Sequence, residues 1–169
     1  MHALKYQSIV APDGIILHLS KAYTGTTHDL MMYQQSGIID ILDQLAFNTT
    51  GQALAIYGDS AYMCDGHMLI GYTGANLTPE QARFNKTMSG LCIVVEWAFG
   101  EVTKYFSGTD FPRSHRLLST CIESHYRFTI LLTNIHTCFY GSKINELFSV
   151  DPPTLQEYIH PDIMEQVME

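Results

Sequence analysis

The chain has 169 residues, of which 46% are hydrophobic and 15% charged, and its 9 Lys and Arg against 17 Asp and Glu give a net charge of −8. A chain of this length fits one domain better than two and can bury a core, and its composition argues against disorder. The acidic balance argues against a protein that holds a long stretch of nucleic acid phosphates, but it leaves room for a short basic groove. No apolar run reaches about 18 residues and the first residues lack the pattern of a secretion signal, so we expect neither a membrane span nor secretion.

The first quarter of the chain predicts a β-hairpin followed by a helix. Residues 4–11 alternate apolar and polar side chains, residues 12–14 (Pro-Asp-Gly) are typical of a turn, and residues 15–23 form a second extended run. Thr26 and Asp29 then have the spacing of a capping box, which predicts that a helical segment begins there.

The middle of the chain predicts a short helix, a buried strand and a long helix. We expect the short helix over residues 38–47 and the strand over the apolar run 53–57, which stops at Gly58. Residues 60–77 are rich in Gly, Tyr and Met and have no clear periodicity. Thr78 followed by Pro79 then predicts the start of the clearest helix. Its apolar positions step by four and three along one face: Phe84, Met88, Leu91, Val95, Ala98 and Val102.

The last third predicts a break over residues 107–114, a buried apolar helix over 117–139 and an acidic tail. Strands followed by long helices indicate an α/β fold. We divide the chain into a domain at residues 1–142 and an acidic C-terminal tail at residues 143–169.

Three carboxylates are candidates for metal binding or catalysis. Asp59 follows the expected strand, where a glycine permits a tight exit, and such a position suits either a divalent metal or the capping of the next turn. Glu96 stands between Val95 and Trp97, which fits either a metal ligand or an exposed helix glutamate whose aromatic neighbours pack on the other side. For Asp29 the capping role is favoured over metal binding.

Five segments in order resemble the DDE superfamily endonucleases of Harbinger/PIF-type transposases: HALKYQSIVAPDG, GTTHDL, YGDSAY, NLTPEQARFNKTMS with VVEWAFG, and LLTNIHTCFYG. The resemblance runs from about His2 to Thr154. Each motif alone is weak, but their order and spacing together are specific.

The resemblance implies a ribonuclease H-like fold, a mixed sheet flanked by helices, in which three carboxylates bind two Mg²⁺ or Mn²⁺ ions for DNA strand cleavage and transfer. It matches Asp59 to the second acid of the triad and Glu96 to the third, both catalytic and metal-binding. Asp29 matches an accessory metal-binding position.

The resemblance also implies that an element is missing. The family's first aspartate lies on a first, central strand upstream of the hairpin, and this chain begins at the hairpin. We therefore expect an N-terminally truncated domain with an incomplete triad and impaired cleavage. DNA is the partner that the family role implies. That role also implies a nuclear protein, with a cytoplasmic location as the alternative.

A second hypothesis comes from a different class of protein. The chain is then a domesticated, non-catalytic scaffold that keeps the fold and contacts a protein partner. The contact surface would be the acidic tail or the tyrosine-rich stretch.

Overall fold

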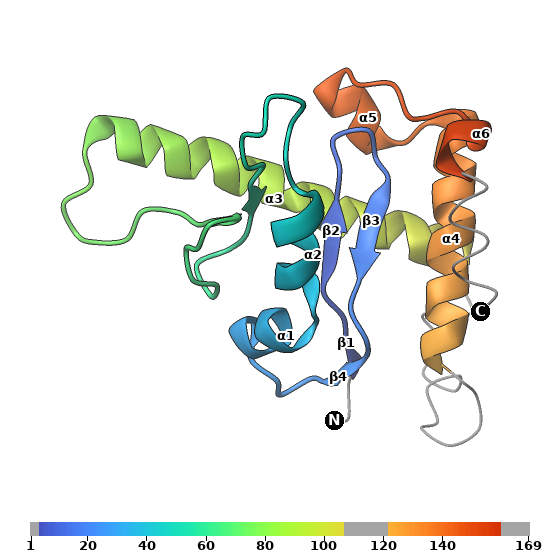
Figure 1. Cartoon of the computed structure of the whole chain (residues 1–169), viewed down its shortest axis with the longest axis horizontal. Coiled ribbons are helices and arrows are strands. Elements are labelled where there is room, and N and C mark those ends of the chain that lie inside the picture. Colours follow the sequence, from blue (N-terminus) through green and yellow to red (C-terminus); the bar gives the residue numbers. More distant parts are fainter. Residues whose placement is uncertain (1–3, 107–121, 160–169) are drawn as a thin grey trace. The chain divides into compact units, whose positions relative to one another are not determined.

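The computed structural model describes residues 4–106 and 122–159. Its strands are short: β1 Leu4–Lys5, β2 Ser8–Val10, β3 Ile16–Leu19, β4 Tyr23–Thr24, β5 Ile56–Tyr57 and β6 Met68–Leu69 (Figure 1). Its helices are α1 Asp29–Gln35, α2 Ile38–Leu45, α3 Pro79–Tyr105, α4 Ile122–Tyr140, α5 Lys143–Phe148 and α6 Leu155–Tyr158. The mixture of strands and helices confirms the α/β class.

Strands pair in twos over the described part of the chain. β1 pairs with β4 and β2 with β3, while β5 and β6 form a parallel pair. The expected hairpin is therefore confirmed, although its second arm is divided into β3 and β4. Ser20 lies at this division, where its N–H donates to Gln7 O at 2.8 Å and its Oγ accepts from Gln7 N–H at 2.9 Å.

The chain divides into two compact units, and each is described by itself. The first consists of Met1–Ile9 with Leu19–Ile93, and the second of Val10–His18 with Val94–Glu169. The division of the sequence at residue 142 stays a prediction. Among the helices that the structure describes, none is long and apolar enough to span a bilayer.

The first unit is built around a small core. Tyr33, Ile38 and Met68 are buried there, from α1, the start of α2 and β6 respectively. Partly buried hydrophobic residues pack against them: Ile9, Ile39, Leu42, Ile56, Tyr62 and Ile70. The expected helix at residues 38–47 is confirmed as α2. Of the strand expected over 53–57, only residues 56–57 form a strand, β5, and Leu54 is exposed. Strand β6 lies within residues 60–77, where no regular structure was expected.

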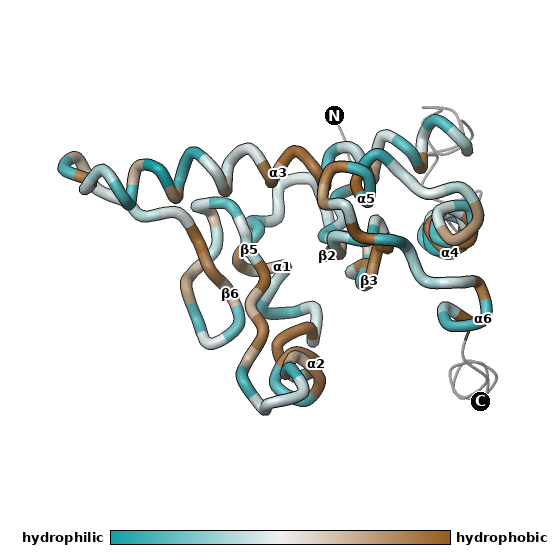
Figure 2. Tube along the Cα trace, turned by 90° about the horizontal axis from the view of Figure 1, so that it is seen from above, coloured by the Kyte–Doolittle hydropathy of each residue, from teal (hydrophilic) through white to brown (hydrophobic). Residues whose placement is uncertain are grey.

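Helix α3 begins where the sequence predicts. Thr78 caps it, since its Oγ1 accepts from Gln81 N–H at 3.2 Å and its own N–H donates to Gln81 Oε1 at 2.9 Å. Figure 2 shows the helix hydrophilic over its first turns and more hydrophobic from its middle. Its buried residues are accordingly Val94, Ala98 and Val102, whereas the earlier apolar positions are only half-buried.

The second unit contains α4, whose buried face is more polar than expected. Thr129, Thr133 and Thr137 are all buried, and the latter two hydroxyls donate to the carbonyl four residues earlier at 2.8 and 3.1 Å. Phe128 and Phe139 are exposed instead. The expected break at 107–114 and the start of the expected helix, up to residue 121, lie outside the described residues.

The hairpin turn packs beside the start of α5 in this unit. Gly14 has a φ of 89°, and a Cβ there would collide with the Ser142 side chain, so the turn requires glycine. Ser142 caps α5 by accepting from the N–H groups of Ile144 and Asn145. Figure 1 shows the hairpin tip near α5.

Candidate active site

The parallel pair of the first unit ends in a loop that starts with Gly58 and Asp59. The Gly58 N–H donates to Leu69 O at 2.9 Å, which extends the β5–β6 pairing by one residue. A Cβ on Gly58 would lie 2.7 Å from Tyr62 Cδ2 and 2.8 Å from Met68 Sδ. Close packing therefore requires glycine here, and Asp59 is delivered at the carboxyl end of a parallel pair, where open α/β sheets bind their ligands.

Asp59 is exposed and partly engaged in the turn that follows it. Its Oδ1 accepts from Ala61 N–H at 2.8 Å, and its carbonyl accepts from Tyr62 N–H at 3.2 Å. The turn-capping role considered from the sequence is thus present. It uses one carboxylate oxygen and leaves the side chain open to solvent.

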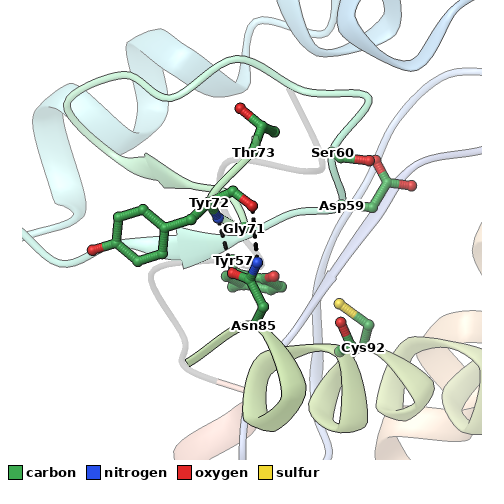
Figure 3. A pocket seen from close by; sticks show the side chains of 9 residues that line it. Tyr57, Asp59, Ser60, Gly71, Tyr72, Thr73, Asn85 and Cys92 are labelled. Atoms are coloured by element: carbon green, nitrogen blue, oxygen red, sulfur yellow. Dashed lines mark hydrogen bonds between the residues drawn. The ribbon is translucent and has the colours of Figure 1, made fainter. Parts of the chain in front are cut away.

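An open pocket of about 290 Å³ lies beside Asp59 (Figure 3). Its lining comes from β5 and the loop after it, from the segment after β6, and from α3. The residues are Tyr57, Asp59, Ser60, Gly71, Tyr72, Thr73, Asn85, Ser89 and Cys92. Only one of these side chains is a carboxylate, and the others are hydroxyls, an amide, aromatic rings and a thiol.

Asn85 fixes one wall of this pocket. Its Oδ1 accepts from Tyr72 N–H and its Nδ2 donates to Tyr72 O, both at 2.8 Å, as the dashed lines of Figure 3 show. The Phe84 ring stands edge-on between two tyrosines, 5.4 Å from Tyr72 and 6.2 Å from Tyr57. No sequence pattern distinguishes Asn85 from an ordinary helix asparagine. The sequence therefore does not predict that Asn85 and Tyr72 line a pocket.

The pocket's thiol is held in its neutral form. Burial first, and then the nearby Asp59 charge, raise the pKa of Cys92. The pKa of Tyr57 is raised by burial, with smaller effects from Cys92 and Asp59. Because thiolate rather than thiol binds metals and attacks electrophiles, Asp59 is the pocket group best suited to a hard cation.

The charges of Asp59 and of another candidate, Asp29, both act on Tyr62. Its hydroxyl accepts from Gln7 Nε2 at 2.7 Å, and its ring stands edge-on to Tyr33 at 6.0 Å. The pKa of Tyr62 is raised, mainly by burial and further by the charges of Asp29 and Asp59, against the lowering effect of Gln7. Both carboxylates therefore lie close enough to act on one phenol.

Asp29 is paired with a cation of the protein. Lys5 Nζ lies 2.6 Å from its Oδ1 and also donates to Thr27 O at 3.4 Å. The expected capping box is wrong, because α1 begins at Asp29 after an extended His28, without a side-chain cap. The reason is that the ion pair with Lys5 of β1 gives the carboxylate a charged partner, which the backbone N–H of Thr26 in a capping box would not.

Glu96 lies in the second unit and is exposed on α3. Its neighbours Val95 and Trp97 are half-buried, which matches the exposed-helix alternative considered from the sequence. The assignment of Glu96 as a catalytic metal ligand stays a prediction.

The described residues do not gather a cluster of metal-binding side chains. Within residues 4–106 and 122–159, no group of three or more His, Cys, Asp or Glu side chains is arranged to hold a metal ion. Asp59 has the right chemistry for Mg²⁺ or Mn²⁺, but Asp29 is neutralised by Lys5. Among the described residues of the first unit, Asp59 is therefore a single exposed carboxylate with the chemistry of a metal ligand.

Comparison with known families identifies the class of protein. A family model described as DDE superfamily endonuclease matches residues 1–134. The chain therefore belongs to the DDE superfamily endonucleases, a family generally dependent on divalent metals. No curated protein and no solved structure matches the chain.

Proposed function

We propose that this chain is a domain of a Harbinger/PIF-type transposase, with a ribonuclease H-like origin and with DNA as its partner, whose strand cleavage is weak or absent. The observation that supports it best is the position of Asp59. This exposed carboxylate follows a parallel strand pair beside a pocket, in a chain whose first 134 residues match an endonuclease family. Asp59 and Glu96 are the carboxylates that we assign to a divalent cation.

The impairment follows from the ligand set. DDE chemistry uses carboxylates to hold two ions that activate the attacking oxygen and stabilise the leaving oxygen. Asp29 is paired with Lys5, and the described residues form no cluster of three or more metal-binding side chains. The loss of one member from a group of residues that acts as a unit costs orders of magnitude in rate. A nuclear location follows from the same proposal, since a transposase acts on chromosomal DNA.

Metal binding and plasmid nicking by the full chain test this function. We expect weak Mn²⁺ binding by calorimetry that Asp59→Asn reduces at least about tenfold, because a carboxylate ligand is replaced by a neutral amide. Asp40→Asn, an exposed acid on α2, is the matched control and should bind as the parent does. Equal affinity in Asp59→Asn and the parent contradicts the assignment of Asp59. Robust nicking of supercoiled plasmid that Asp59→Asn abolishes contradicts the impairment.

A domesticated scaffold without catalysis is the second candidate. The Lys5–Asp29 ion pair favours it, because a cation of the protein neutralises one carboxylate that the family resemblance assigns to metal. On this proposal a protein partner takes the place of DNA. A calorimetric titration that detects no Mg²⁺ or Mn²⁺ binding in the parent chain supports the scaffold over the nuclease.

A further inference from the structure

The ends of α3 and α4 carry a series of aromatic rings, tilted against one another, in the second unit. Tyr105 and His136 have ring centroids 4.2 Å apart and planes at 32°. His136 and Tyr140 follow at 4.8 Å and 43°. We call these three rings the aromatic ladder. Phe139 continues it at 6.1 Å from Tyr140.

The aromatic ladder ends in solvent. Tyr140 is 78% exposed and Phe139 is 61% exposed, although both rings are large and hydrophobic. His136 and Tyr140 lie one helical turn apart on α4, so the helix itself sets their spacing. The rings are therefore held in place with the last of them open to another ring.

Two cations accompany the aromatic ladder. Lys104 Nζ lies 5.1 Å from the centroid of the Tyr105 ring, and exposed Lys143 begins α5 just after Tyr140. Each lysine has a carboxylate three positions away, Glu101 before Lys104 and Glu146 after Lys143, and Glu101 accepts from the Lys143 N–H at 3.4 Å. With the charges nearly balanced, ring stacking rather than phosphate attraction has to supply most of the binding energy.

We propose that the aromatic ladder is a stacking site for a base of single-stranded DNA. This rests on the proposed function, since it names the form of DNA that the domain holds. A base placed on Tyr140 continues the series of rings, and stacking accepts any base because each has a π-face. Duplex bases are already stacked on their neighbours and cannot reach the ring. Such a site also suits a chain with a net charge of −8, because it needs few phosphate contacts.

Fluorescence measurements on the full chain test the stacking site. The probe is a short single strand with one 2-aminopurine, compared with the same sequence as a duplex. We expect tighter binding of the single strand and quenching of the 2-aminopurine. Tyr140→Ala should weaken binding by about five- to 150-fold, and Tyr140→Trp should retain it, because aromatic stacking on one base is worth about 1–3 kcal/mol.

Phe128→Ala is the matched control, since Phe128 is 56% exposed on the same helix but outside the ladder. It should bind the single strand as the parent does. Equal losses in Phe128→Ala and Tyr140→Ala, or no loss in Tyr140→Ala, overturn the proposal. Binding of an arginine-rich peptide but no single strand, lost in Tyr140→Ala, also overturns it and shows a protein partner. Asp59→Asn should keep its single-strand affinity, so failure of the metal site and failure of the stacking site are told apart.

Discussion

The side chain of Asn134 on α4 bonds both backbone groups of Ile16 on β3. Ile16 N–H donates to Asn134 Oδ1 at 3.0 Å, and Asn134 Nδ2 donates to Ile16 O at 2.9 Å. The same Nδ2 donates to Tyr158 Oη at 2.9 Å. Asn134 is only 2% exposed, so water cannot reach these backbone groups of the strand. The Asn134 amide supplies the two hydrogen bonds that a neighbouring strand would otherwise provide.

Asn134→Ala should strongly destabilise the protein. The substitution leaves the N–H and C=O of Ile16 buried without partners, and each such group costs about 1–3 kcal/mol. We expect a loss of about 2–6 kcal/mol in the free energy of unfolding, measured by urea denaturation. Asn85→Ala removes the same pair of bonds, to Tyr72, at an exposed site, and should cost less than about 1 kcal/mol. Equal losses in the two variants would show that burial does not set the cost.

Gly58→Ala should also destabilise the protein. A Cβ at Gly58 falls 2.7 Å from the Tyr62 ring and 2.8 Å from Met68 Sδ, and such overpacking costs about 1–3 kcal/mol. Gly90→Ala is the matched control, because a Cβ there meets nothing within 4 Å in the middle of α3. It should stabilise by about 0.5–1 kcal/mol through helix propensity. Thermal unfolding of both variants checks the prediction, and a lower melting temperature for Gly90→Ala would contradict it.

The local elements could be predicted from the sequence where one short-range signal dominates. Thr78 and Pro79 fix the start of α3 by cap and φ preference, and the turn at residues 12–14 fixes the hairpin. Such a short-range signal gives a wrong prediction where a residue distant in the sequence binds the side chain instead. Asp29 has the spacing for a cap, but Lys5, 24 positions earlier, takes its carboxylate.

The candidate site could be predicted only in part, for the same reason. The position of Asp59 after a strand follows from the apolar run and the glycine, and the structure confirms it. Asn85, in contrast, shapes the pocket through two hydrogen bonds to the Tyr72 backbone, and no sequence pattern predicts these bonds. The role of Tyr62 has a signal in the sequence, because Tyr62 follows Gly58 by four positions. Its ring packs on Gly58, where a larger residue would not fit.

The ion pair of Lys5 and Asp29 should contribute to stability rather than to metal binding. Both side chains are about one-third exposed, so we expect a coupling energy of roughly 0.5–1 kcal/mol. A double-mutant cycle with Lys5→Met and Asp29→Asn measures it by urea denaturation. Calorimetry with Mn²⁺ on Asp29→Asn provides the second readout, and its affinity should equal that of the parent. Loss of Mn²⁺ binding in Asp29→Asn would show that the carboxylate is a metal ligand after all.

Asp65 should make the stability of the first unit depend on acid pH. Partial burial acts to raise its pKa, but this is outweighed by the N–H groups of His67 and Met68, at 2.8 and 2.6 Å, by the Tyr33 hydroxyl and by the His67 charge. The net effect is a lowered pKa. Burial first, and then the neighbouring Asp65 carboxylate, raise the pKa of Tyr33 to about 12.

A carboxyl group whose pKa is lower in the folded state stabilises that state above the unfolded pKa, and this stabilisation is lost as the pH falls through the folded pKa. The free energy of unfolding should therefore decrease between about pH 5 and pH 3. Asp65→Asn should be less stable at pH 7, because a neutral amide accepts the two N–H groups more weakly, and should lose less on acidification. Urea denaturation at both pH values checks the sign. A parent and an Asp65→Asn variant with the same pH dependence would assign the acid sensitivity to other carboxylates.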